Sequence, residues 1–182
     1  MKPKENLKTD PFKNKVEEAE RLLTRFYEHP QEGEGELCQF INTPFTARAF
    51  LVAFLTGSLF NLNDHAGDIV IEMLRKKIEF TAEVLIKNLV MSRAMILTHQ
   101  KNNDETMSEQ SKLVNERTLK TIKLIGSEIL DKKRILLLEA IQAKTSEQVL
   151  NTENPFSDFL ERWQYDTKQL KAMKETLESI SA

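Results

Sequence analysis

The sequence predicts an all-α fold, an antiparallel helical bundle of six or seven helices around one long central helix. Composition is the first reason: 182 residues with 5 glycines, 5 prolines and 2 tyrosines hold too few turn and strand formers for a β-sandwich or barrel. The second reason is that apolar residues recur at helical spacing along most of the chain. Thirdly, a capping residue followed by Pro-Phe, a strong helix-start signal, occurs three times.

Asp10-Pro11-Phe12 predicts the start of the first helix, and Pro30 predicts its end. Residues 1–9 are mostly polar and are expected to form a flexible N-terminal tail. Residues 10–182 are expected to form a single helical domain, because a chain of this size buries about 70% of its unfolded surface on folding. Residues 31–36 contain two glycines and three glutamates, so we expect a loop there.

Thr43-Pro44-Phe45 predicts a second helix that extends to about Phe60 and is apolar on most faces. Arg48 is its only charged residue. Such a helix must be buried within the chain or paired with another one. A symmetric second copy is the simplest cover, so we expect a homodimer with twofold symmetry. The alternative is that a helix formed by residues 129–141 covers it within one chain.

The expected interface combines the apolar helix with an aromatic residue near a helix end. Aromatic residues at such junctions usually lock two helices together and occasionally anchor a partner. The expected interface residues are Phe50, Leu51, Phe54 and Trp163.

From Ala66 to Lys101 no proline interrupts the helical pattern, which predicts one continuous helix on the order of 50 Å long. Its most apolar part, residues 84–97, is interrupted by Lys87 and Arg93. That stretch is shorter than the roughly 20 apolar residues that a membrane span requires. We therefore expect a buried central helix and no membrane span.

The rest of the chain shows further start and stop signals. A narrower apolar stripe ends at Gly126, and Ser127 can cap the helix that follows. Asn154-Pro155-Phe156 repeats the Pro-Phe start signal. Residues 145–148 and 166–169 have the form of capping boxes, so each is expected to open a helix.

Charge and cysteine content limit the class of partner and the compartment. Lys and Arg number 26 and Asp and Glu 28, which leaves a net charge of −2. The chain as a whole lacks the positive field that attracts nucleic acid, so we expect no nucleic-acid partner.

A single cysteine, Cys38, excludes both an intramolecular disulfide and an all-cysteine zinc site. We expect a cytoplasmic protein, since no secretory signal is visible at the N-terminus.

One group of residues has spacing that suits a metal. His65, Asp68 and Glu72 are separated by three and four residues, so they share one face of a helix and could offer an imidazole and two carboxylates. The alternative interpretation is a first helical turn in which acids are favoured by the helix dipole and the histidine is exposed. No histidine follows a glutamate by three residues, so a ferritin-like site is not expected.

No constellation of catalytic residues is recognisable, so we expect neither an enzyme nor a bound cofactor. By elimination, the sequence favours a non-enzymatic helical interaction protein, an adaptor or assembly factor that binds a protein partner and self-associates. The alternative hypothesis is a metal- or ligand-binding helical bundle with a sensor or redox role. It would use His65, Asp68 and Glu72, or the methionine-lined seam near His99.

Overall fold

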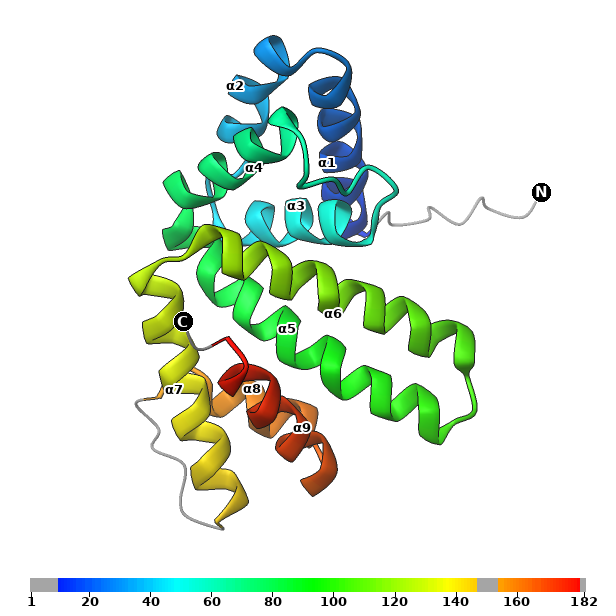
Figure 1. Cartoon of the computed structure of the whole chain (residues 1–182), viewed down its shortest axis with the longest axis vertical. Helices are drawn as coiled ribbons and strands as arrows, with labels where there is room; N and C mark the ends of the chain where they lie inside the picture. Colours follow the sequence, from blue (N-terminus) through cyan, green and yellow to red (C-terminus); the bar gives the residue numbers. More distant parts are fainter. Residues whose placement is uncertain (1–9, 147–153, 181–182) are drawn as a thin grey trace, which may run out of the picture.

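The structure, a computed structural model, describes residues 10–146 and 154–180, which form nine α-helices and no strand (Figure 1). The expected all-α fold is confirmed, although the described residues form nine helices rather than the expected six or seven. The expected tail of residues 1–9 lies outside the described residues. In chain order the helices are α1 (Pro11–Glu28), α2 (Pro30–Phe40), α3 (Pro44–Thr56), α4 (His65–Lys76), α5 (Ile78–Lys101), α6 (Glu105–Ile125), α7 (Glu128–Thr145), α8 (Ser157–Trp163) and α9 (Thr167–Glu178).

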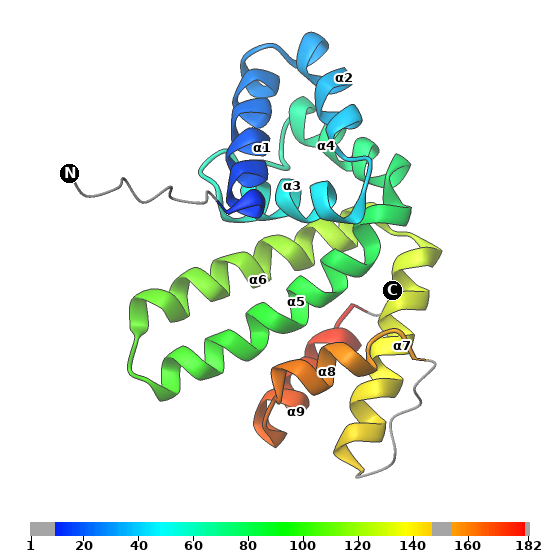
Figure 2. The same ribbon diagram turned by 180° about the vertical axis from the view of Figure 1, so that it is seen from behind.

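Helices α1 to α4 gather at one end of the molecule, and the antiparallel pair α5 and α6 runs beneath α3 (Figure 1). Helices α7, α8 and α9 lie on the opposite side of this pair, as the view from behind shows (Figure 2). Helix α5 contacts α3, α4, α6, α7 and α9. Its apolar residues are therefore covered from several directions; Leu85, Ile86 and Leu89 have no exposed surface.

The expected continuous helix from Ala66 to Lys101 is wrong, because the chain breaks at Lys77. The backbone of Lys77 has φ −108° and ψ 20°, which ends α4 and starts α5 in a new direction. Arg75, just before the break, donates from Nε to the carbonyl of Ile125 at 2.9 Å and also to that of Leu124. These bonds tie the end of α4 to the end of α6. The local sequence does not predict the break, because neither proline nor glycine occurs around Lys77.

The expected loop at residues 31–36 is also wrong, because these residues belong to α2. Gly33 is buried against α1, and a Cβ atom at that position would lie 2.5 Å from the Cα atom of Phe26. The glycine thus allows two helix backbones to approach closely rather than forming a turn. Tertiary packing outweighs the poor helix propensity of glycine at this site.

Helix α3 ends at Thr56 rather than near Phe60, and it is covered within the chain. Phe50, Leu51 and Phe54 keep at most 1% of their surface exposed. The covering helices are mainly α1, α5 and α6, rather than the 129–141 segment offered as the alternative. The apolar faces of α3 are therefore covered without a second copy of the chain. The argument that placed a dimer interface on this helix is thus wrong.

Most local start and stop signals are confirmed. Asp10 accepts from the amide of Phe12, Gly126 has a positive φ of 52° at the end of α6, and Ser127 caps α7. Asp166 and Gln169 form a complete capping box, whereas the one expected at residues 145–148 falls partly outside the described residues. Asn154 accepts from the amide of Phe156, although α8 begins only at Ser157.

The two glycines of α2 provide a matched pair of substitutions. Gly33→Ala should destabilise the protein by about 1–3 kcal/mol, because the new methyl group overlaps the backbone of Phe26. Gly35→Ala should stabilise it by about 0.5–1 kcal/mol, because a Cβ atom there meets nothing within 4 Å and alanine favours a helix. Urea unfolding of both variants checks the pair; equal effects would show that α1 and α2 do not pack through Gly33.

Candidate functional site

A groove of about 510 Å³ lies between α3, α5 and α8, and we call it the α3/α5/α8 groove. Leu51 and Phe159 are buried and form its base. Phe45 and Trp163 also line it and are 46% and 49% exposed. The full lining consists of Pro44, Phe45, Arg48, Leu51, Val52, Glu83, Val84, Lys87, Asn88, Met91, Phe159, Arg162 and Trp163.

The α3 side of the groove is fixed by contacts with α1. The ring of Phe45 meets the ring of Phe12 edge to face, with 5.6 Å between centroids and 71° between planes. The guanidinium carbon of Arg48 lies 4.6 Å from the centroid of the same Phe12 ring. Such aromatic and cation–π contacts hold side chains in place at the surface. Phe45 and Arg48 are therefore positioned by their neighbours while still facing solvent.

The α5 side of the groove carries a small charge network. Lys87 Nζ lies 2.7 Å from Glu83 Oε1, and Lys133 Nζ of α7 lies 3.0 Å from Glu83 Oε2. Lys87 Nζ is also 5.5 Å from the ring centroids of Phe156 and of Phe159. Burial raises the pKa of Glu83, but the hydrogen bonds and positive charges of the two lysines outweigh it, so the pKa lies below the ordinary value of 4.5.

The charges that line the groove do not balance. Arg48, Lys87 and Arg162 are positive, and Glu83 is the single acid among the lining residues. Within the described part of the chain, neither arginine has an ion-pair partner, while Glu83 is shared with Lys133 outside the groove. The groove therefore combines exposed aromatic rings, an apolar base and unpaired guanidinium groups.

The predicted metal ligands lie elsewhere, at the start of α4. His65, Asp68 and Glu72 are exposed, and Glu72 forms an ion pair with Arg75. Asp68 and Glu72 line one depression and His65 lines another. Among residues 10–146 and 154–180, no three histidine, cysteine or acidic side chains lie close enough to hold a metal ion. Metal binding by this trio stays a prediction, which the geometry does not support.

Of the four predicted interface residues, the structure leaves only Trp163 accessible, since Phe50, Leu51 and Phe54 are buried. The sequence interpretation missed Phe45, Arg48 and Arg162, which complete the groove around Trp163. Phe45 and Arg48 are three residues apart near the start of α3. The one usable signal was Arg48, a lone charge on an apolar helix, which had to face solvent.

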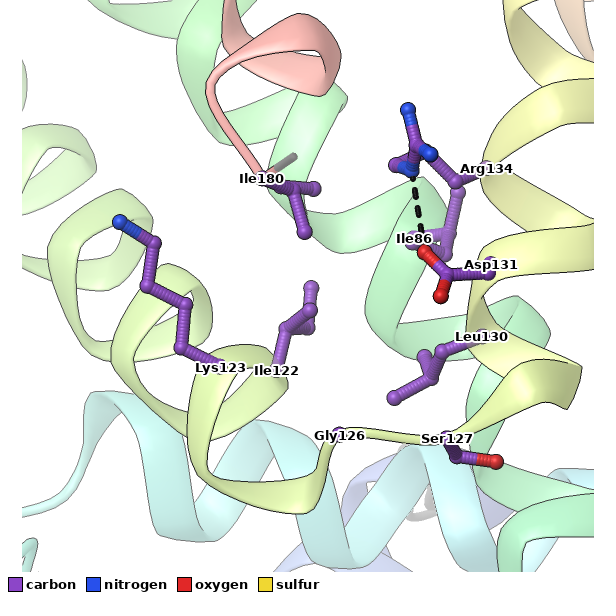
Figure 3. Close-up of a pocket in the computed structure, with 9 residues that line it drawn as sticks. All are labelled: Ile86, Ile122, Lys123, Gly126, Ser127, Leu130, Asp131, Arg134 and Ile180. Atoms are coloured by element: carbon purple, nitrogen blue, oxygen red, sulfur yellow. Dashed lines mark hydrogen bonds and ion pairs between the residues drawn. The ribbon is translucent and has the colours of Figure 1, made fainter. Parts of the chain in front are cut away.

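A second cavity of about 340 Å³ lies where α6 meets α7. Figure 3 shows Ile122, Leu130 and Ile180 pointing toward a shared space, which Ile86 also lines. Its rim is polar, and Arg134 Nε lies 3.3 Å from Asp131 Oδ1 there. The lining of this cavity thus combines apolar side chains with a charged rim, an arrangement that no residue pattern in the sequence indicated.

Glu83 gives the protein a testable pH dependence. Because its folded-state pKa is lowered, its ion pairs add stability above the unfolded-state pKa, and this contribution is lost as the pH falls below 4.5 through the lowered value. With 38% of the side chain exposed, we expect at most about 1 kcal/mol.

Glu83→Gln should therefore be less stable than the wild type at about pH 7, and the gap should shrink at about pH 3. Chemical unfolding at both pH values measures the gap. Glu79→Gln is the control, because Glu79 lies exposed on the same helix and has no ion-pair partner among the described residues. A gap that is equally large at both pH values would contradict the assigned network.

Comparison with known proteins finds one family. No curated protein and no solved structure matches the chain. Within its described residues no helix is long and apolar enough to cross a membrane. A family model described as "uncharacterised conserved protein UCP020893" matches residues 11–180, from the first residue of α1 to beyond the end of α9. The match includes every helix that builds the groove, and the chain belongs to this family.

Proposed function

We propose that the protein is a non-enzymatic helical interaction protein, an adaptor or assembly factor, and that its α3/α5/α8 groove binds a segment of a protein partner. The observation that carries this proposal is that the side chains of Phe45 and Trp163 line the groove beside its apolar base while 46% and 49% of their surface stays exposed to solvent. Exposed aromatic rings around a hollow are typical of binding surfaces, where such residues supply most of the binding energy.

The polar groups of the groove also favour binding over catalysis. Glu83 is held by Lys87 and Lys133, and Asn88 donates to Thr118 Oγ1 at 2.9 Å. These side chains are therefore engaged in holding α5 to its neighbours. Arg48 and Arg162 are left as hydrogen-bond donors toward the groove, and guanidinium groups recognise anions rather than accept protons.

The cavity in Figure 3 supports a second candidate, a ligand-binding bundle with a sensor role. Its lining is apolar at Ile86, Ile122 and Leu130 and charged at Lys123 and at the Arg134–Asp131 pair, as expected for a small amphipathic ligand. The metal-binding version of this candidate would use His65, Asp68 and Glu72. An absorption spectrum and metal analysis of the purified protein separate these versions from the interaction protein.

The proposal also includes a cytoplasmic location, in which the single thiol of Cys38 stays reduced. It includes self-association as well, although no longer through Phe50, Leu51 and Phe54, which are buried.

Affinity purification from the native cell tests the groove. The double variant Phe45→Ser/Trp163→Ser should lose a partner protein that the wild type retains, because two aromatic anchors are removed. Leu113→Ser/Ile135→Ser is the matched control, since these side chains are 45% and 46% exposed on other helices. The proposal fails if no protein is lost selectively from the groove variant, or if the control loses the same protein.

Sedimentation equilibrium tests self-association. A homodimer should give a mass near twice 21.1 kDa at micromolar concentration, and a contact through the groove should make Phe45→Ser/Trp163→Ser shift that mass toward the monomer. A mass near 21.1 kDa at every concentration would exclude self-association in this range.

A further inference from the structure

We infer that the α3/α5/α8 groove recognises an acidic amphipathic helix of a partner protein, one whose apolar stripe is flanked by Asp and Glu. This inference rests on the proposed function and adds the chemistry of the partner. It comes from three features of the groove: its unbalanced charge, its apolar base and the helices that form it.

Charge complementarity points to an acidic partner. Arg48 on α3 and Arg162 on α8 are exposed and, within the described residues, have no acidic partner. The single lining acid, Glu83, is neutralised by Lys87 and Lys133. Carboxylates of a partner would thus meet guanidinium groups on two different helices and no free acid among the lining residues. Guanidinium forks bind carboxylates through two parallel hydrogen bonds.

The base of the groove selects apolar side chains. Leu51, Val52, Val84 and Met91 are aliphatic or thioether groups, and Phe45 and Trp163 extend this surface toward solvent. Leu, Ile, Met or Phe side chains of a partner fill such a surface well, and methionine adapts to their shapes. A partner with both properties is amphipathic, apolar toward the base and acidic toward the arginines.

The architecture favours a helix as the bound segment. A partner strand needs an exposed sheet edge with which to pair, and the described residues form helices without any sheet. Ridges on α3, α5 and α8 offer grooves that a fourth helix can pack into at ordinary helix–helix distances.

Single-stranded nucleic acid and a lipid surface fit less well. A nucleic acid would stack successive bases on aromatic rings along a positive track, whereas Phe45 and Trp163 are the only exposed rings that line this groove and the whole chain has a net charge of −2. A flat bilayer would leave a hollow of about 510 Å³ unfilled.

Selection from a random helical-peptide display library tests the inference with the full chain. We expect peptides that bind the wild type but bind Phe45→Ser/Trp163→Ser at least tenfold more weakly, and these should be enriched in Asp and Glu beside a Leu, Met or Phe stripe. Groove-dependent peptides of neutral or basic character would overturn the inference while leaving the proposed function standing. Failure to select any groove-dependent peptide would overturn both.

Charge reversal then tests the arginines directly. Arg48→Glu/Arg162→Glu should weaken a selected acidic peptide by about tenfold or more, while the exposed pair Arg21→Glu/Lys132→Glu, on α1 and α7, should change its affinity less than threefold. Trp163 is the only tryptophan in the sequence, so a blue shift of its fluorescence reports occupancy of the groove. Equal weakening by both pairs would overturn the inference, as would binding of oligonucleotides or anionic vesicles that competes with the peptide.

Discussion

The break at Lys77 is the constraint on which the rest of the structure depends. It leaves α4 packed with the first three helices and directs α5 beneath α3 (Figure 1). A 24-residue helix that is apolar on most sides must then be enclosed from several directions, by α3, α6, α7 and α9. Because these helices approach α5 at different angles, they leave hollows between them. Val84, Lys87 and Met91 of α5 line the groove, and Ile86 lines the cavity in Figure 3.

Long cationic side chains hold these helices by binding carbonyl groups where other helices end. Arg117 of α6 donates to the carbonyls of Leu55 and Gly57 at 2.9 and 2.8 Å, just where α3 stops. Lys144 of α7 donates to the carbonyl of Leu160 at 3.0 Å. The last carbonyls of a helix have no hydrogen-bond partner within it and carry partial negative charge. A cationic side chain supplies both the hydrogen bond and the opposite charge. At the end of α3 these contacts lie beside Gly57, whose extended backbone (ψ 165°) ends the helix before Phe60.

Whether a feature could be predicted from the sequence depends on how far apart the contacting residues lie in the chain. Helix starts depend on residues two or three positions apart, so Asp10, Ser127 and Asp166 revealed them. The break at Lys77 and the burial of Gly33 depend on residues from other helices, and no local pattern contains that information. The same holds for the groove. Trp163 stood out as an aromatic residue at a helix end, but it lines the same groove as Arg48 only because the fold brings α3 and α8 to the same part of α5.

The two exposed aromatic rings of the groove are not sufficient for tight binding of the proposed partner, so the rest of the groove must contribute as well. Aromatic side chains bury roughly 150–250 Å² each, so covering the exposed halves of Phe45 and Trp163 removes about 200 Å² from water. At about 25 cal/mol per Å² this amounts to roughly 5 kcal/mol. Association itself costs about 4–15 kcal/mol in lost motion, so two rings alone barely offset it. For the proposed partner, the remaining binding energy must come from the apolar base and from Arg48 and Arg162, and these two guanidinium groups then decide which segment binds.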